Sequence, residues 1–234
     1  MNKDTIDNPV REHILLHSEN KILINAIKRA LNLLIDSSFS LFYKKEPPLH
    51  SNLLNIGCNE DKRSDWVNAD RIFYNGKFVS ADWTLDASNH WKCSNDRWDG
   101  IFTEHMIEHL SYKGVITMLS EALRTLKPGK WIRIVVPDVS QYVEFYNGNK
   151  VNDDFQKFHF GAIAISNLTQ CWGHLSVWDE VLLAAVLTEI GFVNVAKVSF
   201  GQGTDQYLIV DKAERRVESL YIEAQKPLSK LDEK

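Results

Sequence analysis

Leu53-Leu-Asn-Ile-Gly-Cys-Asn59 is the stretch that decides the fold of this chain. It follows the break made by Pro47-Pro48, and the run Asn52–Ile56 has the composition of a buried strand that leads straight into Gly57. In a doubly wound sheet, ligands bind at the edge where the first strand turns toward its helix, and a glycine there lets them approach the backbone. The stretch therefore predicts the start of an α/β core domain with a ligand-binding turn.

Short apolar runs alternate with helical patterns along the rest of the chain. A helix is expected over 112–126, because Ser111 is a good N-cap and Lys127-Pro-Gly129 is a stop signal. Further strands are expected at Trp66–Ala69, Lys77–Ala81, Gly100–Thr103, Trp131–Val136, Phe192–Phe200 and Glu218–Ala224. Strands that alternate with helices predict a parallel sheet.

A second helix is expected over the apolar run Val181–Ile190. The preceding Ser176-Val-Trp-Asp179 is a Ser-x-x-Asp variant of the capping box, in which the serine would cap the helix. Gly191 provides the stop at the other end.

The chain divides into an extension, one domain and a tail. Residues 1–48 form an N-terminal extension, in which apolar residues recur at helical spacing between Asn20 and Leu34. This amphipathic helix is expected to cover the domain, with membrane contact and packing in a homodimer as alternatives. The core domain is expected over 49–227 and a charged tail over 228–234. Within the domain, the aromatic-rich segment 138–178 predicts an insertion over a pocket, where it would select the substrate.

Composition restricts the classes of protein that need to be considered. The chain has 234 residues, of which 44% are hydrophobic and 25% charged, as in one globular domain. A net charge of −4 argues against a nucleic-acid partner. Cys58, Cys93 and Cys171 form no CxxC pair, so neither a disulfide framework nor a thiolate metal site is expected. No signal peptide or integral membrane segment is expected either, and the predicted location is the cytoplasm.

A carboxylate ends the second predicted strand. Asp70 lies where an acidic side chain can accept hydrogen bonds from both hydroxyls of a ribose, although a helix cap is an equal alternative for this residue alone. The dinucleotide fingerprint G-x-G-x-x-G and the phosphate loop ending in Gly-Lys-Ser/Thr are both absent from the sequence. A nucleoside ligand without phosphates fits this combination.

Several segments, in this order, carry a resemblance to a known family: LLNIGCN at 53–59, WVNAD at 66–70, Asp86, WDGIFTEHMIEHLSY at 98–112 and ALRTLKPGKWIRIVVPD at 122–138. Over residues 52–226 the chain resembles the class I S-adenosylmethionine-dependent methyltransferases, in a branch with the pattern LNIGCG…WINxD…EHxxEH…LKPGG…VPD. The resemblance implies an enzyme with an α/β, Rossmann-like methyltransferase fold. That fold has a mostly parallel seven-stranded sheet, helices on both faces and an antiparallel last strand. S-adenosyl-L-methionine is the implied cofactor.

The resemblance also implies roles for single residues. Gly57 would approach the methionine portion of the cofactor, Asp70 would hold the ribose, and Asp86 with Ala87 would border the adenine. Glu104 would help to close the pocket. The cofactor-binding set implied in this way is Asn55, Gly57, Cys58, Asn59, Asp70, Asp86, Ala87, Glu104 and His105.

Two residues depart from the family pattern. Asn59 replaces the second glycine of the loop, and Asn55 stands where many relatives carry an acidic residue. Asparagine is among the non-glycine residues that best tolerate positive φ, so we expect Asn59 to keep the turn.

Methyl transfer from a sulfonium depends mainly on alignment, because the leaving group needs no acid. A hydroxyl acceptor must also lose a proton, which a histidine or aspartate near the pocket can take. His105, Asp138 and His174 are the catalytic candidates, because two of them follow strands and His174 lies in the aromatic insertion. His109 is expected to orient the segment that follows it.

The acceptor is expected to be a small molecule or a glycan. A sugar hydroxyl in polysaccharide biosynthesis is preferred by analogy with the family. A carboxyl or amine of a small metabolite and a non-catalytic cofactor-binding scaffold are the alternatives.

His105-Met-Ile-Glu-His109 also matches the H-x-x-E-H pattern of zinc peptidases, in which two helical histidines bind the metal. Because the match lies inside the longer methyltransferase-like pattern, no metal is expected.

Overall fold

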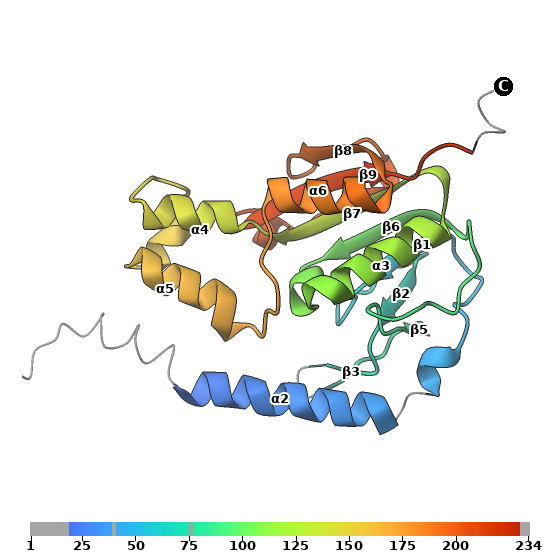
Figure 1. Cartoon of the computed structure of the whole chain (residues 1–234), viewed down its shortest axis with the longest axis horizontal. Coiled ribbons are helices and arrows are strands. Elements are labelled where there is room, and N and C mark those ends of the chain that lie inside the picture. Colours follow the sequence, from blue (N-terminus) through green and yellow to red (C-terminus); the bar gives the residue numbers. More distant parts are fainter. Residues whose placement is uncertain (1–18, 39–40, 75–76, 230–234) are drawn as a thin grey trace, which may run out of the picture.

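A seven-stranded sheet forms the centre of the structure (Figure 1), with strand order β5-β2-β1-β6-β7-β9-β8. The computed structural model describes residues 19–38, 41–74 and 77–229. The strands are β1 (Leu53–Ile56), β2 (Val67–Asp70), β5 (Trp83–Thr84), β6 (Trp98–Glu104), β7 (Leu126–Pro137), β8 (Val193–Val198) and β9 (Ser219–Gln225). The neighbouring strands β5, β2, β1, β6 and β7 run parallel, whereas β9 is antiparallel to its neighbours β7 and β8. The predicted Rossmann-like methyltransferase fold with its antiparallel last strand is therefore confirmed.

One predicted strand lies outside this sheet. The expected strand Lys77–Ala81 is reduced to β4 (Lys77–Phe78), which pairs with β3 (Phe73–Tyr74) in a separate hairpin. Both residues of β4 are exposed. Trp83 is 1% exposed and packs against two other tryptophan rings, so burial of this side chain fixes β5 at the edge of the sheet.

The chain does not enter a helix after β1, which corrects the expectation at Gly57. Residues 57–66 are all described and contain no helix. This polar segment has no helical repeat of apolar residues, and Asn68 holds it by accepting a hydrogen bond from the Arg63 backbone N–H (2.8 Å) and donating to the Arg63 carbonyl (3.0 Å). The turn is therefore fixed by side-chain hydrogen bonds from β2.

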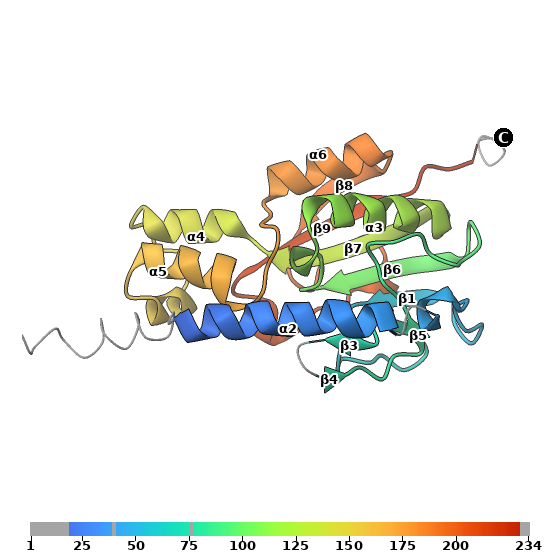
Figure 2. The same ribbon diagram turned by 60° about the horizontal axis from the view of Figure 1, so that its bottom comes forward.

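Helices α3 (Tyr112–Thr125) and α6 (Glu180–Ile190) cover one face of the sheet (Figures 1 and 2). Ser111 caps α3 as predicted, by accepting a hydrogen bond from Gly114 N at 3.2 Å. The predicted N-cap residue of α6, Ser176, is wrong. Asp179 is the N-cap and accepts from Leu182 N at 2.8 Å, whereas the Ser176 hydroxyl donates to the Leu110 carbonyl at 2.9 Å.

The segment between β8 and β9 covers the opposite face. It contains the short 3-10 helices η5 (Gln206–Leu208) and η6 (Ala213–Arg215). Leu208 is fully buried there and packs with Phe102 and Tyr221 of the sheet. A segment without regular periodicity thus completes the core and approaches the carboxyl edge of the strands.

The predicted insertion contains short helices with a core of their own. These elements are α4 (Val139–Tyr146), η3 (Asp153–Lys157), α5 (Gly161–Ser166) and η4 (Asn167–Cys171), and their buried residues are Tyr142, Phe155, Phe158, Ala164 and Leu168. The helix α2 (Glu19–Ser38) contacts β3 and η4, so it bridges the hairpin and the insertion (Figure 2). Leu23, Ile27 and Leu34 on α2 remain exposed. The remaining 3-10 helices are η1 (Phe42–Lys44) and η2 (Ile107–His109).

No helix among the described residues has the length and apolar character needed to span a bilayer. The proposed domain boundaries stay a prediction. The expected N-terminal segment before residue 19 and the end of the tail lie outside the described residues.

Candidate functional site

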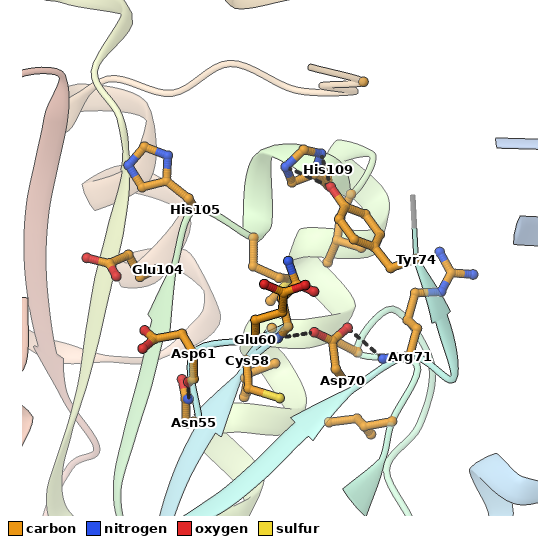
Figure 3. A pocket seen from close by; sticks show the side chains of 18 of the residues that line it. Asn55, Cys58, Glu60, Asp61, Asp70, Arg71, Tyr74, Glu104, His105 and His109 are labelled. Atoms are coloured by element: carbon orange, nitrogen blue, oxygen red, sulfur yellow. Dashed lines mark hydrogen bonds between the residues drawn. The ribbon is translucent and has the colours of Figure 1, made fainter. Parts of the chain in front are cut away.

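A cavity of about 650 Å³ opens at the carboxyl ends of β1, β2 and β6 (Figure 3). This volume is within the range of small-molecule sites. Eight of the predicted cofactor residues line the cavity: Asn55, Gly57, Cys58, Asn59, Asp70, Ala87, Glu104 and His105. The predicted residue Asp86 is not among the lining residues.

The turn after β1 requires its glycine. Gly57 has φ +79°, and a Cβ added to it would lie 2.4 Å from Met106 Cγ. The backbone N–H groups of Gly57 and Cys58 both donate to the Ala69 carbonyl, at 2.8 and 3.2 Å. The positive φ and the Met106 side chain at the position of a Cβ together exclude a larger residue at 57.

Asn59 has φ +43°, so it adopts the left-handed conformation expected for it. Its backbone N–H donates to Asp70 Oδ2 at 2.7 Å. The turn that a second glycine would provide is therefore formed by asparagine, with a direct link to the second strand.

This geometry predicts opposite results for two substitutions of Asn59. Asn59→Gly should leave S-adenosylhomocysteine binding unchanged, because glycine adopts positive φ freely. Asn59→Val should cost about 1–2 kcal/mol in the turn and weaken binding, because a β-branched residue resists this conformation. Calorimetric titration of both variants checks the prediction. Equal affinity of the valine variant and the parent would contradict it.

Asp70 is held with its carboxylate toward the cavity. Oδ2 accepts from Asn59 N and Oδ1 accepts from Arg71 N, both at 2.7 Å (Figure 3). Each carboxylate oxygen can accept more than one hydrogen bond. The two backbone donors therefore orient a group that is suited to a pair of vicinal hydroxyls.

Asp86 is held by local hydrogen bonds, and its predicted place beside the adenine stays a prediction. Oδ1 accepts from the backbone N–H of Ser88 at 3.1 Å and from its hydroxyl at 2.7 Å, and Oδ2 accepts from Asn89 at 2.8 Å. The carboxylate thus caps the turn 86–89, while the adjacent Ala87 lines the cavity.

Glu104 and Asn55 connect the cavity floor to neighbouring segments. Glu104 accepts a hydrogen bond from Lys212 N at 3.2 Å, and burial raises the pKa of its carboxyl. The Asn55 amide donates to the Asp61 carbonyl (3.0 Å) and to Asn68 Oδ1 (3.2 Å). Asn55 therefore keeps the loop after β1 in place without adding a charge to the site.

His105 lies at the end of β6 and lines the cavity. Its Nε2 is 2.8 Å from the Ser219 hydroxyl, which itself donates to the Arg215 carbonyl at 2.7 Å. Nε2 must therefore carry the proton, and Nδ1, 3.5 Å from Glu108 Oε1, is the unprotonated nitrogen. Burial, with smaller effects of Arg215 and neighbouring histidines, lowers the pKa of His105 to about 3. The ring is neutral at physiological pH.

The other two predicted catalytic residues do not line the cavity. Asp138 is 3% exposed and caps α4 by accepting from the backbone N–H of Ser140 at 3.0 Å and from its hydroxyl. His174 lies behind the wall, with its ring 4.9 Å from that of His109 and Nε2 4.0 Å from Glu108 Oε1. Glu108 is 1% exposed, and burial raises its pKa to about 8.

Several cavity residues escaped prediction from the sequence, namely Lys28, Arg71, Tyr74, Lys212 and Arg215. They come from α2, the turn after β2, the small hairpin and the segment between β8 and β9. None of these segments carries a motif that points to the cavity. The aromatic character of the insertion, in contrast, does indicate Trp172, which lines the cavity.

The structure also rules out the helical arrangement of an H-x-x-E-H peptidase. His105 has φ +49° and lies outside η2, which is a single 3-10 turn. His105 and His109 therefore do not lie on one face of an α-helix.

The comparison with known proteins agrees with this geometry. A family model described as a methyltransferase domain matches residues 25–197. No curated protein sequence matches the chain significantly. The chain is similar to an S-adenosylmethionine-dependent methyltransferase from Archaeoglobus fulgidus, with 16% identity, TM-score 0.45 and coverage of 85% of this chain and 94% of that one.

Two further solved structures are similar to the chain, with comparable sequence identity and TM-score. One is a methyltransferase from Methanosarcina mazei, with 15% identity, TM-score 0.47 and coverage of 78% and 95% of the two chains. The other is phosphoethanolamine N-methyltransferase 2 from Haemonchus contortus in complex with S-adenosyl-L-methionine. It has 13% identity, TM-score 0.44 and coverage of 85% of this chain and 52% of that one.

The cavity residues fit the cofactor that the family implies. The Asp70 carboxylate suits a ribose diol, and the Gly57 turn lines the cavity without a phosphate-binding loop. The family model covers well over half of the chain, and the chain belongs to this methyltransferase family as an S-adenosylmethionine-dependent enzyme.

Proposed function

We propose that the enzyme transfers the methyl group to a hydroxyl of a sugar or glycan precursor. The observation that supports this acceptor best is the aromatic rim of the cavity. Trp172 lines the cavity from the insertion and is 64% exposed, so a large apolar ring face is available at the mouth. Tyr74 and His109 lie opposite His105 in the same cavity (Figure 3). Aromatic faces beside polar groups suit a sugar, which has both apolar C–H faces and hydroxyls.

When bound, the cofactor supplies an electrophilic methyl group on a sulfonium. Asp70 would hold the ribose and the turn at Gly57 would hold the methionine portion, so alignment of the acceptor is the main requirement of the reaction. His105 is the residue that we assign to the acceptor hydroxyl. Its neutral ring lines the cavity and has Nδ1 unprotonated, and we propose that Nδ1 receives the hydroxyl proton when the acceptor is bound.

The remaining catalytic candidates receive other roles in this proposal. Asp138 stabilises the start of α4, and with it the entry into the insertion. His174 supports the wall behind Trp172 and Gly173 and does not contact the acceptor. A reducing compartment such as the cytoplasm is part of the proposal, supported by the wide spacing of the three cysteines.

A small-metabolite carboxylate is the second candidate acceptor. Lys28, Arg71 and Arg215 all line the cavity, and cationic side chains favour an anion. A carboxylate is already ionised and needs no base, so only the hydroxyl acceptor requires His105 to take a proton.

Replacing His105 by alanine should separate the two candidates. Sugar acceptors and small carboxylates are first screened with cofactor carrying a labelled methyl group. With a hydroxyl acceptor, His105→Ala should lower kcat by about 10²–10⁴-fold, the usual contribution of a positioned base. With a carboxylate acceptor, kcat should stay within a few-fold of the parent.

His90→Ala is the matched control, because His90 is exposed and lines a different depression. It should leave both rates unchanged. Transfer to a carboxylate alone, with none to any sugar, would overturn the sugar proposal and leave the methyltransferase assignment intact.

A further inference from the structure

Metal-ligating side chains gather at the edge of the cofactor cavity, and cofactor binding does not explain them. Glu108, His109 and His174 each offer one ligand atom, and these atoms all lie within 4.8 Å of one another. Of the three, His109 lines the cavity, while Glu108 and His174 lie just behind it. We propose that these three residues bind a divalent transition-metal ion such as zinc.

Glu108 is the strongest indication of a ligand. Its side chain is 2% exposed, and neither carboxylate oxygen has a hydrogen-bond partner within the described part of the chain. The neighbouring nitrogens, His105 Nδ1 at 3.5 Å and His174 Nε2 at 4.0 Å, do not satisfy it. A buried carboxylate without a hydrogen-bond donor from the protein is costly, and a coordinated cation would remove that cost.

The backbone holds the two ligand-bearing segments together. The Glu108 carbonyl accepts hydrogen bonds from Leu175 N at 2.8 Å and from Ser176 N at 3.2 Å. The Ser176 hydroxyl also donates to the Leu110 carbonyl at 2.9 Å. His174 is therefore fixed beside Glu108 by its own neighbours, as a preorganised site requires.

His109 is contacted from across the cavity. The Tyr74 hydroxyl lies 3.2 Å from both His109 ring nitrogens. This contact orients the ring and leaves either nitrogen as the candidate ligand atom. Tyr74 thus connects the proposed ligand to the hairpin on the other side of the cavity.

The ligand types indicate the class of ion. Two imidazoles and one carboxylate suit zinc and related transition metals better than magnesium or calcium, which prefer oxygen ligands. Two ligands at about 2.1 Å from a tetrahedral ion lie about 3.4 Å apart. The widest spacing permitted by the 4.8 Å limit would therefore need to close by about 1.4 Å through side-chain rotation when the ion binds.

A three-residue site leaves coordination positions open toward the cavity, because His109 forms part of its wall. If the proposed function holds, an acceptor oxygen could occupy one of them. The metal-binding proposal itself does not depend on that function. It does replace the expectation, drawn from the sequence, that the chain holds no metal. That expectation concerned a peptidase helix, whereas the site proposed here uses Glu108 as a ligand and takes His174 from the insertion.

The test is metal binding by the full-length protein, purified without a metal-affinity column and stripped with a chelator. Zn²⁺ is titrated in a calorimeter, and bound metal is counted by elemental analysis after dialysis. The parent should bind one Zn²⁺ per chain. Glu108→Gln and His174→Ala should each weaken binding by at least about 100-fold, because even loss of an outer contact typically costs 10–100-fold. Mg²⁺ should not compete.

His90→Ala, which removes an exposed histidine in a different depression, is the control and should bind Zn²⁺ as the parent does. Added Zn²⁺ should also raise the Tm of the parent and of this control, but not that of Glu108→Gln. Lack of stoichiometric Zn²⁺ binding by the parent would overturn the proposal, and so would equal binding by all four proteins. Methyl transfer is measured separately, so failure of the metal proposal remains distinguishable from failure of the proposed acceptor.

Discussion

Replacing Asp70 by alanine should weaken the binding of S-adenosylhomocysteine by about 100-fold or more. The carboxylate is oriented by two backbone donors at 2.7 Å and faces the cavity, where it would accept both ribose hydroxyls. Hydrogen bonds to a charged group contribute about 1.5–3 kcal/mol each, so the loss of two amounts to about 3 kcal/mol or more. Calorimetric titration measures the effect, with thermal unfolding as a check that the variant remains folded.

Asp99→Asn is the matched control for this prediction. Asp99 lies near the start of β6, at the opposite edge of the sheet, and pairs with Lys127 at 2.9 Å. Its substitution should leave the affinity unchanged. Asp70→Asn retains one acceptor oxygen and should fall between the parent and the alanine variant. If Asp70→Ala binds as tightly as Asp99→Asn, the carboxylate does not hold the ribose.

The part of the cavity formed by the turn after β1 and by Asp70 could be predicted from the sequence, because local backbone conformation and strand position decide it. The turn at Gly57 and Asn59 depends on φ values that few residues adopt, and residue type alone reveals such a requirement. Asp70 follows from its position at the end of a buried strand. These features depend on neighbours in the sequence or on adjacent strands, so pattern and spacing placed the residues, while their cofactor roles came from the resemblance to the family.

The rest of the cavity wall depends on contacts between segments that are distant in the sequence. Tyr74 reaches His109 from a two-stranded hairpin, and Lys212 reaches Glu104 across more than a hundred residues. The sequence placed Asp138 directly after a strand, and the resemblance to the family singled out Asp86. Neither showed that local donors occupy both carboxylates, because a capping carboxylate has the same sequence pattern as a catalytic or ligand-binding one.

Arg133 explains how the irregular segment between β8 and β9 is held against the sheet. Its guanidinium donates to both Asp211 oxygens, at 2.7 and 2.6 Å, and to Glu223 Oε1 at 2.7 Å. All three side chains are at most 1% exposed. The same carboxylates accept from the backbone N–H groups of Gly201 and Thr204, at 2.8 and 2.7 Å. This buried network therefore positions the segment that supplies Lys212 and Arg215 to the cavity.

Arg133→Met should lower the free energy of unfolding by about 3–5 kcal/mol, because it leaves two carboxylates buried without their cation. Urea denaturation measures this loss, which is large against a typical total free energy of unfolding of about 5–15 kcal/mol.

Lys77→Met is the control. Lys77 is 78% exposed in its pair with Glu60, and its loss should leave the urea midpoint unchanged. Adding Asp211→Asn and Glu223→Gln to Arg133→Met removes the unpaired charges and should recover part of the loss. If Arg133→Met shifts the midpoint no more than Lys77→Met does, the network does not hold this segment, and Lys212 and Arg215 must be positioned by the packing of Leu208 instead.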